Sequence, residues 1–291
     1  MNFTEILVGC VVFLFSASNP PQPIGTGFIV QYPCNGIEGR YFPIIITANH
    51  VIAGRDKVLA RFNLKNQGLT SYVKYDISAM KRINDFWNHP DDGVDIVAFR
   101  SLHYEETSYM PLSFDSIASK EIFKTEDIKE TDRIIFPSLL INFMGNSQNY
   151  PVVRNGTIAL IPSEKVPLKY KVGQKEIETK QEVIFVDATS IPGASGSPIF
   201  LFPGPRIKNN SYNLGGKNKA YLLGVMHGFY HAIPRELIEV ETTETKTMFS
   251  ENSGIAIIFP SWKLLELFQN EDFNKRINEL SNIEKEKLKN K

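Results

Sequence analysis

The sequence predicts an all-β fold, either a barrel or a sandwich, and three observations support this prediction. Up to about residue 260 the apolar residues form short runs, bounded by turn-forming clusters such as Pro90-Asp91-Asp92-Gly93 and Pro203-Gly204-Pro205. No long helical period or fixed repeat interrupts these runs. The chain has 291 residues, of which 42% are hydrophobic, so one large domain or two small ones can bury a substantial core.

Charge and cysteine content narrow the function further. Lys and Arg total 32 and Asp and Glu total 32, so no basic excess is available to neutralise phosphates, and nucleic acid is not expected as a partner. The chain has 2 cysteines, Cys10 and Cys34, which favours a reducing compartment. The sequence is compatible with two free buried thiols and with one disulfide bridge between these two cysteines.

The N-terminal run Ile6 to Phe15 has two interpretations. Its length and the following Ser16-Ala17-Ser18 resemble a secretory signal, but Glu5 and the absence of Lys or Arg before the run argue against one. The run is too short to span a bilayer. Val11 to Phe15 is β-branched and aromatic, as expected for a buried strand. We favour the strand and a cytoplasmic location, with a periplasmic or secreted form as the alternative.

The predicted elements follow in chain order. The candidate strands are Thr26–Gln31, Phe42–Ala48, Lys57–Phe62, Asp95–Arg100, Arg133–Phe143, Val152–Leu160, Glu182–Asp187, Ser197–Phe202, Tyr221–His227 and Gly254–Phe259. The polar stretch Ser116–Asp132 is expected to link two halves. Helix is expected only at the end of the chain.

Two helical segments are expected after residue 260. Ser261 can cap the first, Trp262–Asn270, in which Trp262, Leu265 and Phe268 recur at helical spacing. In the charged tail, residues 271–291, the helical stripe is Phe273, Ile277 and Leu280. The tail is expected to pack this stripe on the body, and docking of a partner is the alternative.

Three segments have the residue types of a nucleophilic site. His50 follows the apolar run Ile44-Ile45-Ile46, where a strand end can hold an imidazole rigidly. Asp95 opens an apolar strand, where a carboxylate needs a donor such as an imidazole. Ser195 lies in Gly193-Ala194-Ser195-Gly196, a tight turn that exposes a hydroxyl and backbone N–H groups. Each segment alone has an ordinary structural explanation, but the set in this order predicts a hydrolase.

The chain resembles the chymotrypsin-like serine proteases, and most closely the bacterial branch of Deg-type proteases and glutamyl endopeptidases. The resemblance runs from about residue 8 to 270 and leaves the tail uncovered. The matching segments are Gly25-Thr26-Gly27-Phe28-Ile29-Val30, Thr47-Ala48-Asn49-His50-Val51, Asp95-Ile96-Val97, Pro192 to Pro198, Leu223-Gly224-Val225 and Ser253 to Pro260.

This resemblance implies two antiparallel six-stranded β-barrels followed by a C-terminal helix. Residues 8–115 would form the first barrel, 116–132 the linker, 133–260 the second barrel and 261–270 the helix. Val11 to Phe15 would then be the first strand, and its removal as a signal would damage the barrel. No peptide-binding domain is expected after Pro260, and zymogen activation at the N-terminus is not expected.

The resemblance also implies roles for named residues. Ser195 would attack the scissile carbonyl, His50 would act as base and acid, and Asp95 would fix the imidazole tautomer, while the N–H groups of Gly193 and Ser195 stabilise the oxyanion. The substrate would be a peptide or protein, with no metal or cofactor, and the oligomeric state stays open. His89, His103 and His231 are interpreted as surface or loop residues. A catalytically silent peptide-binding scaffold and an esterase are the alternatives.

The substrate pocket is expected between Thr189, Ser190 and Ile191 on one side and His227, Gly228 and Phe229 on the other. Trypsin-like relatives have an aspartate six positions before the serine, where this chain has Thr189, so basic specificity is not expected. In glutamyl endopeptidases the pocket histidine occupies the position of Met226. A step of one residue along a strand reverses the side chain, so His227 is expected to point towards Asp95. We therefore expect cleavage after small or medium uncharged residues, with acidic residues as the alternative.

Overall fold

A computed structural model describes residues 3–65, 68–102, 105–189, 192–209, 211–213, 221–231 and 252–290. The strands are β1 (Val11–Ser16), β2 (Pro23–Pro33), β3 (Tyr41–Thr47), β4 (Lys57–Leu64), β5 (Thr70–Asp76), β6 (Phe86–Asn88), β7 (Val97–Arg100), β8 (Thr107–Ser108), β9 (Leu112–Ser113), β10 (Arg133–Ser138), β11 (Val152–Leu160), β12 (Val166–Val172), β13 (Lys175–Gln181), β14 (Ile184–Asp187), β15 (Pro198–Leu201), β16 (Arg206–Lys208), β17 (Ser211–Asn213), β18 (Leu222–His231) and β19 (Asn252–Pro260). The helices are α1 (Phe3–Gly9), α2 (Asn49–Ile52), α3 (Ile77–Arg82), α4 (Lys120–Thr125), α5 (Ser261–Phe268) and α6 (Glu271–Lys289), with a 3₁₀ turn at Phe114–Ser116.

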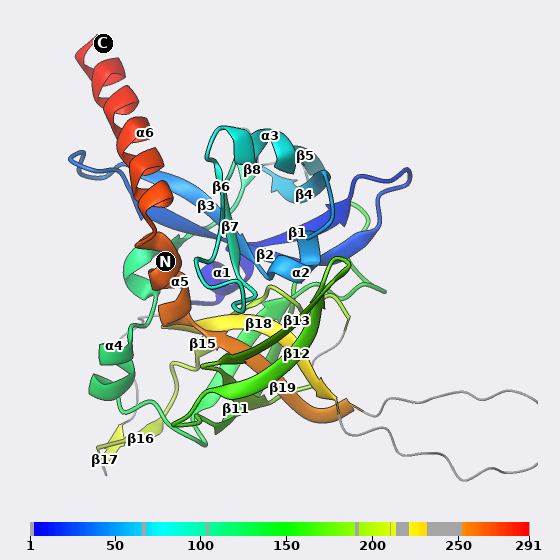
Figure 1. Cartoon of the computed structure of the whole chain (residues 1–291), viewed down its shortest axis with the longest axis vertical. Coiled ribbons are helices and arrows are strands. Elements are labelled where there is room, and N and C mark those ends of the chain that lie inside the picture. Colours follow the sequence, from blue (N-terminus) through cyan, green and yellow to red (C-terminus); the bar gives the residue numbers. More distant parts are fainter. Residues whose placement is uncertain are drawn as a thin grey trace, which may run out of the picture.

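The strands form the two halves of a chymotrypsin-like double β-barrel (Figure 1). The second half is a closed barrel in the order β10-β11-β14-β19-β18-β15. The first half is a 9-stranded sheet in which β5-β4-β1-β2-β3-β7-β6 form the continuous path, rather than a ring of six. Sheet neighbours pair antiparallel, apart from the short β2–β9 pair, which is parallel.

All ten predicted strands are present, Val152–Leu160 with the predicted bounds and the others with shifted ends, but several elements were missed. The strand predicted as Arg133–Phe143 ends at Ser138, and the strand predicted from Asp95 begins at Val97. The expectation of helix only at the end of the chain was wrong, since α1, α2, α3 and α4 are short helices whose apolar periodicity spans too few residues to be recognised. The hairpin β12–β13 was also missed.

The N-terminal run divides into a helix and a strand. Residues Phe3–Gly9 form α1, and Val11–Ser16 form β1 as predicted. β1 is the central neighbour of β2 and β4, with Val12, Phe13 and Leu14 almost fully buried. Within the described residues no helix is both long and apolar enough to cross a bilayer.

The segment between the halves is packed and not a solvated linker. It contains α4, and its side chains Ile117, Ala118, Phe123 and Ile128 are buried. Its polar residues occupy the exposed positions of a short helix that Ser119 caps by accepting from Ile122 N at 3.2 Å. The composition of this segment did not reveal its apolar face.

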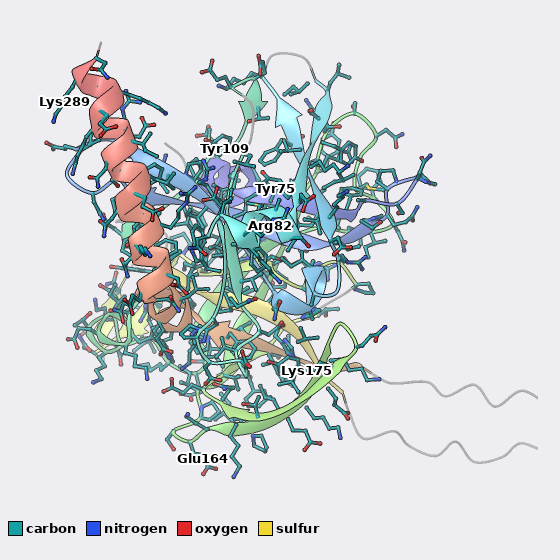
Figure 2. All side chains as sticks on the ribbon, turned by 45° about the horizontal axis from the view of Figure 1, so that its top comes forward. Tyr75, Arg82, Tyr109, Glu164, Lys175 and Lys289 are labelled. Atoms are coloured by element: carbon teal, nitrogen blue, oxygen red, sulfur yellow. The ribbon has the colours of Figure 1, made fainter. Side chains whose placement is uncertain are left out.

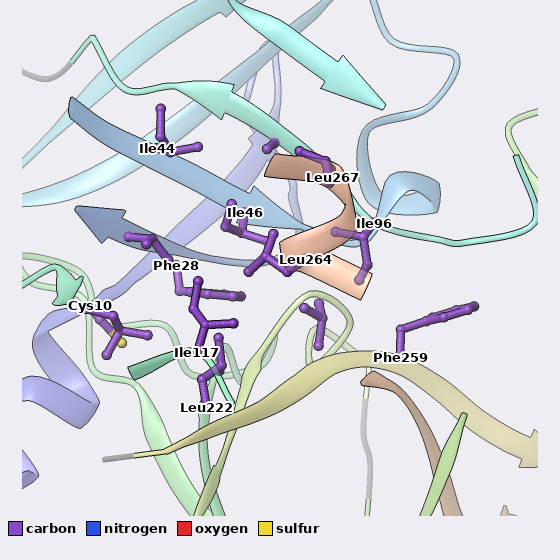
Figure 3. Close-up of a cluster of buried hydrophobic side chains, with 14 of the residues drawn as sticks. Cys10, Phe28, Ile44, Ile46, Ile96, Ile117, Leu222, Phe259, Leu264 and Leu267 are labelled. Carbon is purple, nitrogen blue, oxygen red and sulfur yellow. The ribbon is translucent and has the colours of Figure 1, made fainter. Parts of the chain in front are cut away.

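A buried apolar cluster joins the two halves to the C-terminal helix (Figure 3). Leu264 and Leu267 of α5 share this cluster with Ile46 of β3 and Phe259 of β19. Ser261 is the first residue of α5 rather than its cap, and its Oγ donates to Ala118 O at 2.6 Å. This contact ties the helix to the connection between the barrels.

The predicted tail stripe is confirmed in α6. Phe273 and Ile277 have no exposed surface and Leu280 is 9% exposed. The helix is also anchored by Arg276, whose Nε lies 2.8 Å from the fully buried carboxylate of Asp85. Beyond this anchor α6 extends past the strands of the first barrel (Figure 1).

The cysteines are two free buried thiols, which decides between the alternatives left open by the sequence. Cys10 follows α1, and Cys34 follows β2. Burial holds the pKa of the Cys10 thiol well above its usual range, so this thiol is unreactive near neutral pH.

Candidate active site

The fold brings His50, Asp95 and Ser195 to the junction of the two barrels. His50 lies in α2, which begins where β3 ends, and Asp95 lies in the turn before β7, the strand that pairs with β3. Ser195 lies in the turn that precedes β15 of the second barrel. The first barrel therefore supplies the histidine and aspartate, and the second supplies the serine.

Asp95 is the best-connected residue of this group. Its Oδ1 accepts a hydrogen bond from His50 N at 2.8 Å, and its Oδ2 lies 2.6 Å from His50 Nδ1 and 2.6 Å from His227 Nδ1. The side chain has almost no exposed surface. Burial alone would raise the pKa of this carboxyl, but the two imidazoles outweigh that effect and hold the pKa at about 2. Asp95 is therefore an anion that only accepts hydrogen bonds.

The anion determines the tautomer of His50. Because a carboxylate cannot donate, the proton between the groups resides on Nδ1 of the imidazole, and Nε2 of the neutral ring is left as a base. Burial alone would lower the pKa of His50, but the charge of Asp95 and its hydrogen bond raise that pKa above the ordinary value. This is the electrostatic arrangement that a general base requires.

The Ser195 turn is held by the first barrel. Thr26 N donates to Ser195 O at 3.0 Å, and Thr26 Oγ1 donates to Gly193 O at 2.6 Å. Gly193 has φ of +98° and Gly196 of +83°, a backbone conformation that glycine adopts without strain. Among the described residues, neither the Gly193 N–H nor the Ser195 N–H donates a hydrogen bond.

The hydroxyl of Ser195 does not bond to His50 in this conformation. Its Oγ donates to the backbone carbonyl of His227 at 3.1 Å. For His50 to act as its base, this hydroxyl must turn towards His50 Nε2. Such loose geometry is common in catalytic sites before substrate binds.

His227 points towards Asp95, as the register argument predicts, and not simply into a pocket. Met226 pairs with Ile258 and Gly228 with Ile257, so His227 is the extra residue of a β-bulge. A bulge reorients the side chain of the extra residue. Met226 packs in the core of the second barrel, while the His227 ring reaches the junction.

The expected pocket is only partly described. Thr189 is exposed, its carbonyl accepts from Arg154 Nη1 at 2.8 Å, and Gly228 is half-buried. Ser190 and Ile191 lie outside the described residues, as does the side chain of Phe229. Arg154 was not recognised from the sequence, because nothing in the strand Val152–Leu160 links it to the serine turn.

Of the remaining histidines, the structure describes the side chain of His89 alone. His89 was expected at the surface or in a loop; it follows β6 in a loop but is buried, with Nε2 3.5 Å from Glu266 Oε2 of α5. Burial lowers its pKa. His103 and the side chain of His231 lie outside the described residues.

Sequence reasoning also missed Tyr170, which packs on the histidine beside Asp95. Its ring centroid lies 4.6 Å from that of His227, in an edge-to-face arrangement. Val166, Leu168, Tyr170 and Val172 alternate with Pro167, Lys169 and Lys171 up to Gly173, which is the pattern of a hairpin strand. This signal could have predicted the hairpin, but not its position.

His50, Asp95 and His227 are also close enough to be tested as metal ligands. Within the described residues they are the group of His, Cys, Asp or Glu that could share an ion, with ligand atoms within 4.8 Å of one another. Both N–O separations are 2.6 Å, whereas two ligands of a tetrahedral zinc ion are about 3.4 Å apart. The arrangement fits hydrogen bonding better than metal coordination.

Comparisons with known proteins support the fold. No protein-family model matches the chain, and no curated protein matches it in sequence. Among solved structures, the MamO protease domain from Magnetospirillum magneticum superposes with a TM-score of 0.51 at 13% identity, covering 92% of this chain and 100% of that one. The HtrA-type protease AlgW with a decapeptide matches at 0.48 and 15%, covering 92% of this chain and 66% of that one. The chain therefore has the fold of trypsin-like serine protease domains.

Proposed function

We propose that the chain is a serine endopeptidase that hydrolyses peptide bonds through Ser195, His50 and Asp95. The observation that supports this most directly is the Asp95 Oδ2–His50 Nδ1 hydrogen bond of 2.6 Å beside the Ser195 turn. A buried anion, an imidazole with a basic Nε2 and a serine hydroxyl are the three groups that acyl transfer needs.

The reaction follows from these groups. His50 Nε2 takes the Ser195 proton as Oγ attacks the scissile carbonyl, and the N–H groups of Gly193 and Ser195 stabilise the oxyanion. His50 then protonates the leaving amine, which leaves an acyl-enzyme. Water activated by His50 hydrolyses this ester and restores the serine. His227 contacts the same carboxylate oxygen of Asp95 as His50 does.

The test is covalent labelling with a fluorophosphonate. Wild type should be labelled at one site, and Ser195→Ala should abolish labelling and lower turnover by about 10⁶-fold. The matched control is Ser197→Ala, a buried serine two residues away. Undiminished labelling of Ser195→Ala would place the nucleophile elsewhere.

The second candidate function is a silent peptide-binding scaffold. The observation that favours it is the Ser195 hydroxyl bonded to the His227 carbonyl rather than to His50. If this conformation persists, wild type will resist the fluorophosphonate and will cleave no peptide in a library, yet will bind some of those peptides. Labelling of wild type would exclude this candidate.

For specificity we propose cleavage after small or medium uncharged residues. No acidic side chain replaces Thr189 at the position that attracts basic residues, and the His227 ring is engaged by Asp95. The glutamyl alternative is favoured by one contact, that of the Arg154 guanidinium with the Thr189 carbonyl. Profiling a peptide library with wild type, Arg154→Gln and the control Lys175→Gln separates them. A preference for Glu that disappears only in Arg154→Gln would contradict the uncharged specificity.

A further inference from the structure

The β12–β13 hairpin belongs to the second half of the chain but also contacts the Asp95 loop of the first barrel. It pairs with no strand of the closed barrel among the described residues. Leu168 buries its side chain in the same apolar cluster as Val94 and Ile96, the neighbours of Asp95, and Val166 and Tyr170 pack against that cluster. Figure 2 labels Glu164 before the hairpin and Lys175 near its tip, so the course of the hairpin can be followed.

Polar contacts join this hairpin to the loop that contains Asp95. The Tyr170 hydroxyl donates to Gly93 O at 2.9 Å, and Gln181 Nε2 donates to Asp91 Oδ2 at 2.9 Å. A Cβ at Gly93 would collide with side-chain atoms of Thr179 and Gln181, so the loop backbone lies directly on the hairpin. β12 also lies against α2, the helix of His50.

Tyr170 connects these contacts to the candidate site. Its ring packs edge-to-face on His227, with centroids 4.6 Å apart, and His227 Nδ1 contacts Asp95 Oδ2. Phe259 also packs on this imidazole, with its ring centroid 5.5 Å from that of His227. The His227 imidazole therefore contacts two aromatic rings and a carboxylate.

We propose that Tyr170 is a positioning residue of the site, and that the β12–β13 hairpin holds Asp95 and His227 in place from the second half of the chain. The proposal rests on the proposed function. Tyr170 touches neither Ser195 nor the reacting atoms; it acts by limiting rotation of the His227 ring and by fixing the Gly93 carbonyl two residues before Asp95. Its hydroxyl and its ring have separate tasks.

Two substitutions separate these tasks. Tyr170→Phe removes the hydrogen bond to Gly93 and keeps the ring, whereas Tyr170→Ala removes both. We expect Tyr170→Ala to lower kcat by about ten- to a hundredfold, because small displacements of catalytic groups have effects of this size. Tyr170→Phe should give an intermediate loss, and KM should change by less than about threefold in both.

The matched control is Lys169→Ala on the same strand, since this side chain is exposed and pairs with Glu176 and Glu178 at the surface. It should keep kcat and KM. A change in KM alone for Tyr170→Ala would make Tyr170 a substrate contact, and unchanged kcat in both Tyr170 variants would overturn the proposal.

A second readout does not depend on activity. Nitrogen-15 NMR of the imidazoles reports which ring nitrogen bears the proton. Wild type should show His50 and His227 both protonated at Nδ1, and Tyr170→Ala should show a mixture of tautomers at His227. If wild type fails to hydrolyse peptides but this spectral change occurs, the proposed function fails while the positioning role stands. If Tyr170→Ala does not fold, Tyr170→Phe should still weaken the His50 Nδ1 proton signal, and an unaltered spectrum would contradict the proposal.

Discussion

His227 Nδ1 lies 2.6 Å from Asp95 Oδ2, the same oxygen that His50 Nδ1 contacts at 2.6 Å. Two imidazoles from different barrels thus donate to one carboxylate oxygen. His227 is the extra residue of a bulge in β18, and its ring lies at the junction while Met226 packs in the core of the second barrel. The His227 contact makes Asp95 a junction between the halves as well as a partner of His50.

Replacing Asp95 by Asn should lower turnover by about 10⁴-fold near neutral pH. The amide keeps the shape of the carboxyl, but its NH₂ group favours the wrong tautomer of His50. The measurement is kcat on a peptide or ester substrate that wild type cleaves. Asp92→Asn, an exposed neighbour in the same turn, is the control and should retain activity. A fall of less than tenfold would remove Asp95 from the mechanism.

The pH dependence of kcat/KM should report the pKa of His50. The base must be neutral, so kcat/KM should rise with pH as His50 loses its proton. Because Asp95 raises the pKa of His50, the midpoint of this rise should lie above the ordinary value of 6.5. The profile of wild type between about pH 5 and pH 9 checks this. A midpoint below 6.5 would mean that burial outweighs the charge of Asp95.

Removing the Phe273 side chain should destabilise the fold by about 3–5 kcal/mol. The ring is fully buried and lies 4.7 Å from the Trp87 ring and 4.8 Å from the Tyr32 ring, measured between centroids. Denaturant unfolding of Phe273→Ala measures the loss. Leu288→Ala, near the exposed end of the same helix, should change the stability by less than about 0.5 kcal/mol. Equal effects of the two substitutions would show that α6 does not pack in solution.

Reductant should leave the melting temperature nearly unchanged, because Cys10 and Cys34 are free and buried. A thiol reagent should modify neither cysteine rapidly in the native protein and both after unfolding. A drop in melting temperature of more than about 5 °C on reduction would indicate a structural bridge instead.

Much of this architecture could be predicted from local pattern. The alternating and apolar runs located the main strands, because side chains of a sheet point to opposite faces at each step. The stripe of Phe273, Ile277 and Leu280 predicted α6, because residues three or four positions apart lie on one face of a helix. His50, Asp95 and Ser195 were recognised as a set, because their three segments occur in the order and with the residue types of the chymotrypsin-like serine proteases.

The sequence by itself therefore determined the main strands, the two C-terminal helices and the identity of the three candidate residues. Only the tertiary structure decided which groups from distant parts of the sequence lie next to the segments of these three residues. Tyr170 on Gly93, Arg154 on Thr189 and Thr26 on the Ser195 turn are contacts between segments far apart in the chain. No local period encodes such contacts, since they depend on how two barrels and one hairpin pack. The number of strands in each half was decided in the same way, because closure of a sheet follows from long-range pairing and not from the pattern of any one strand.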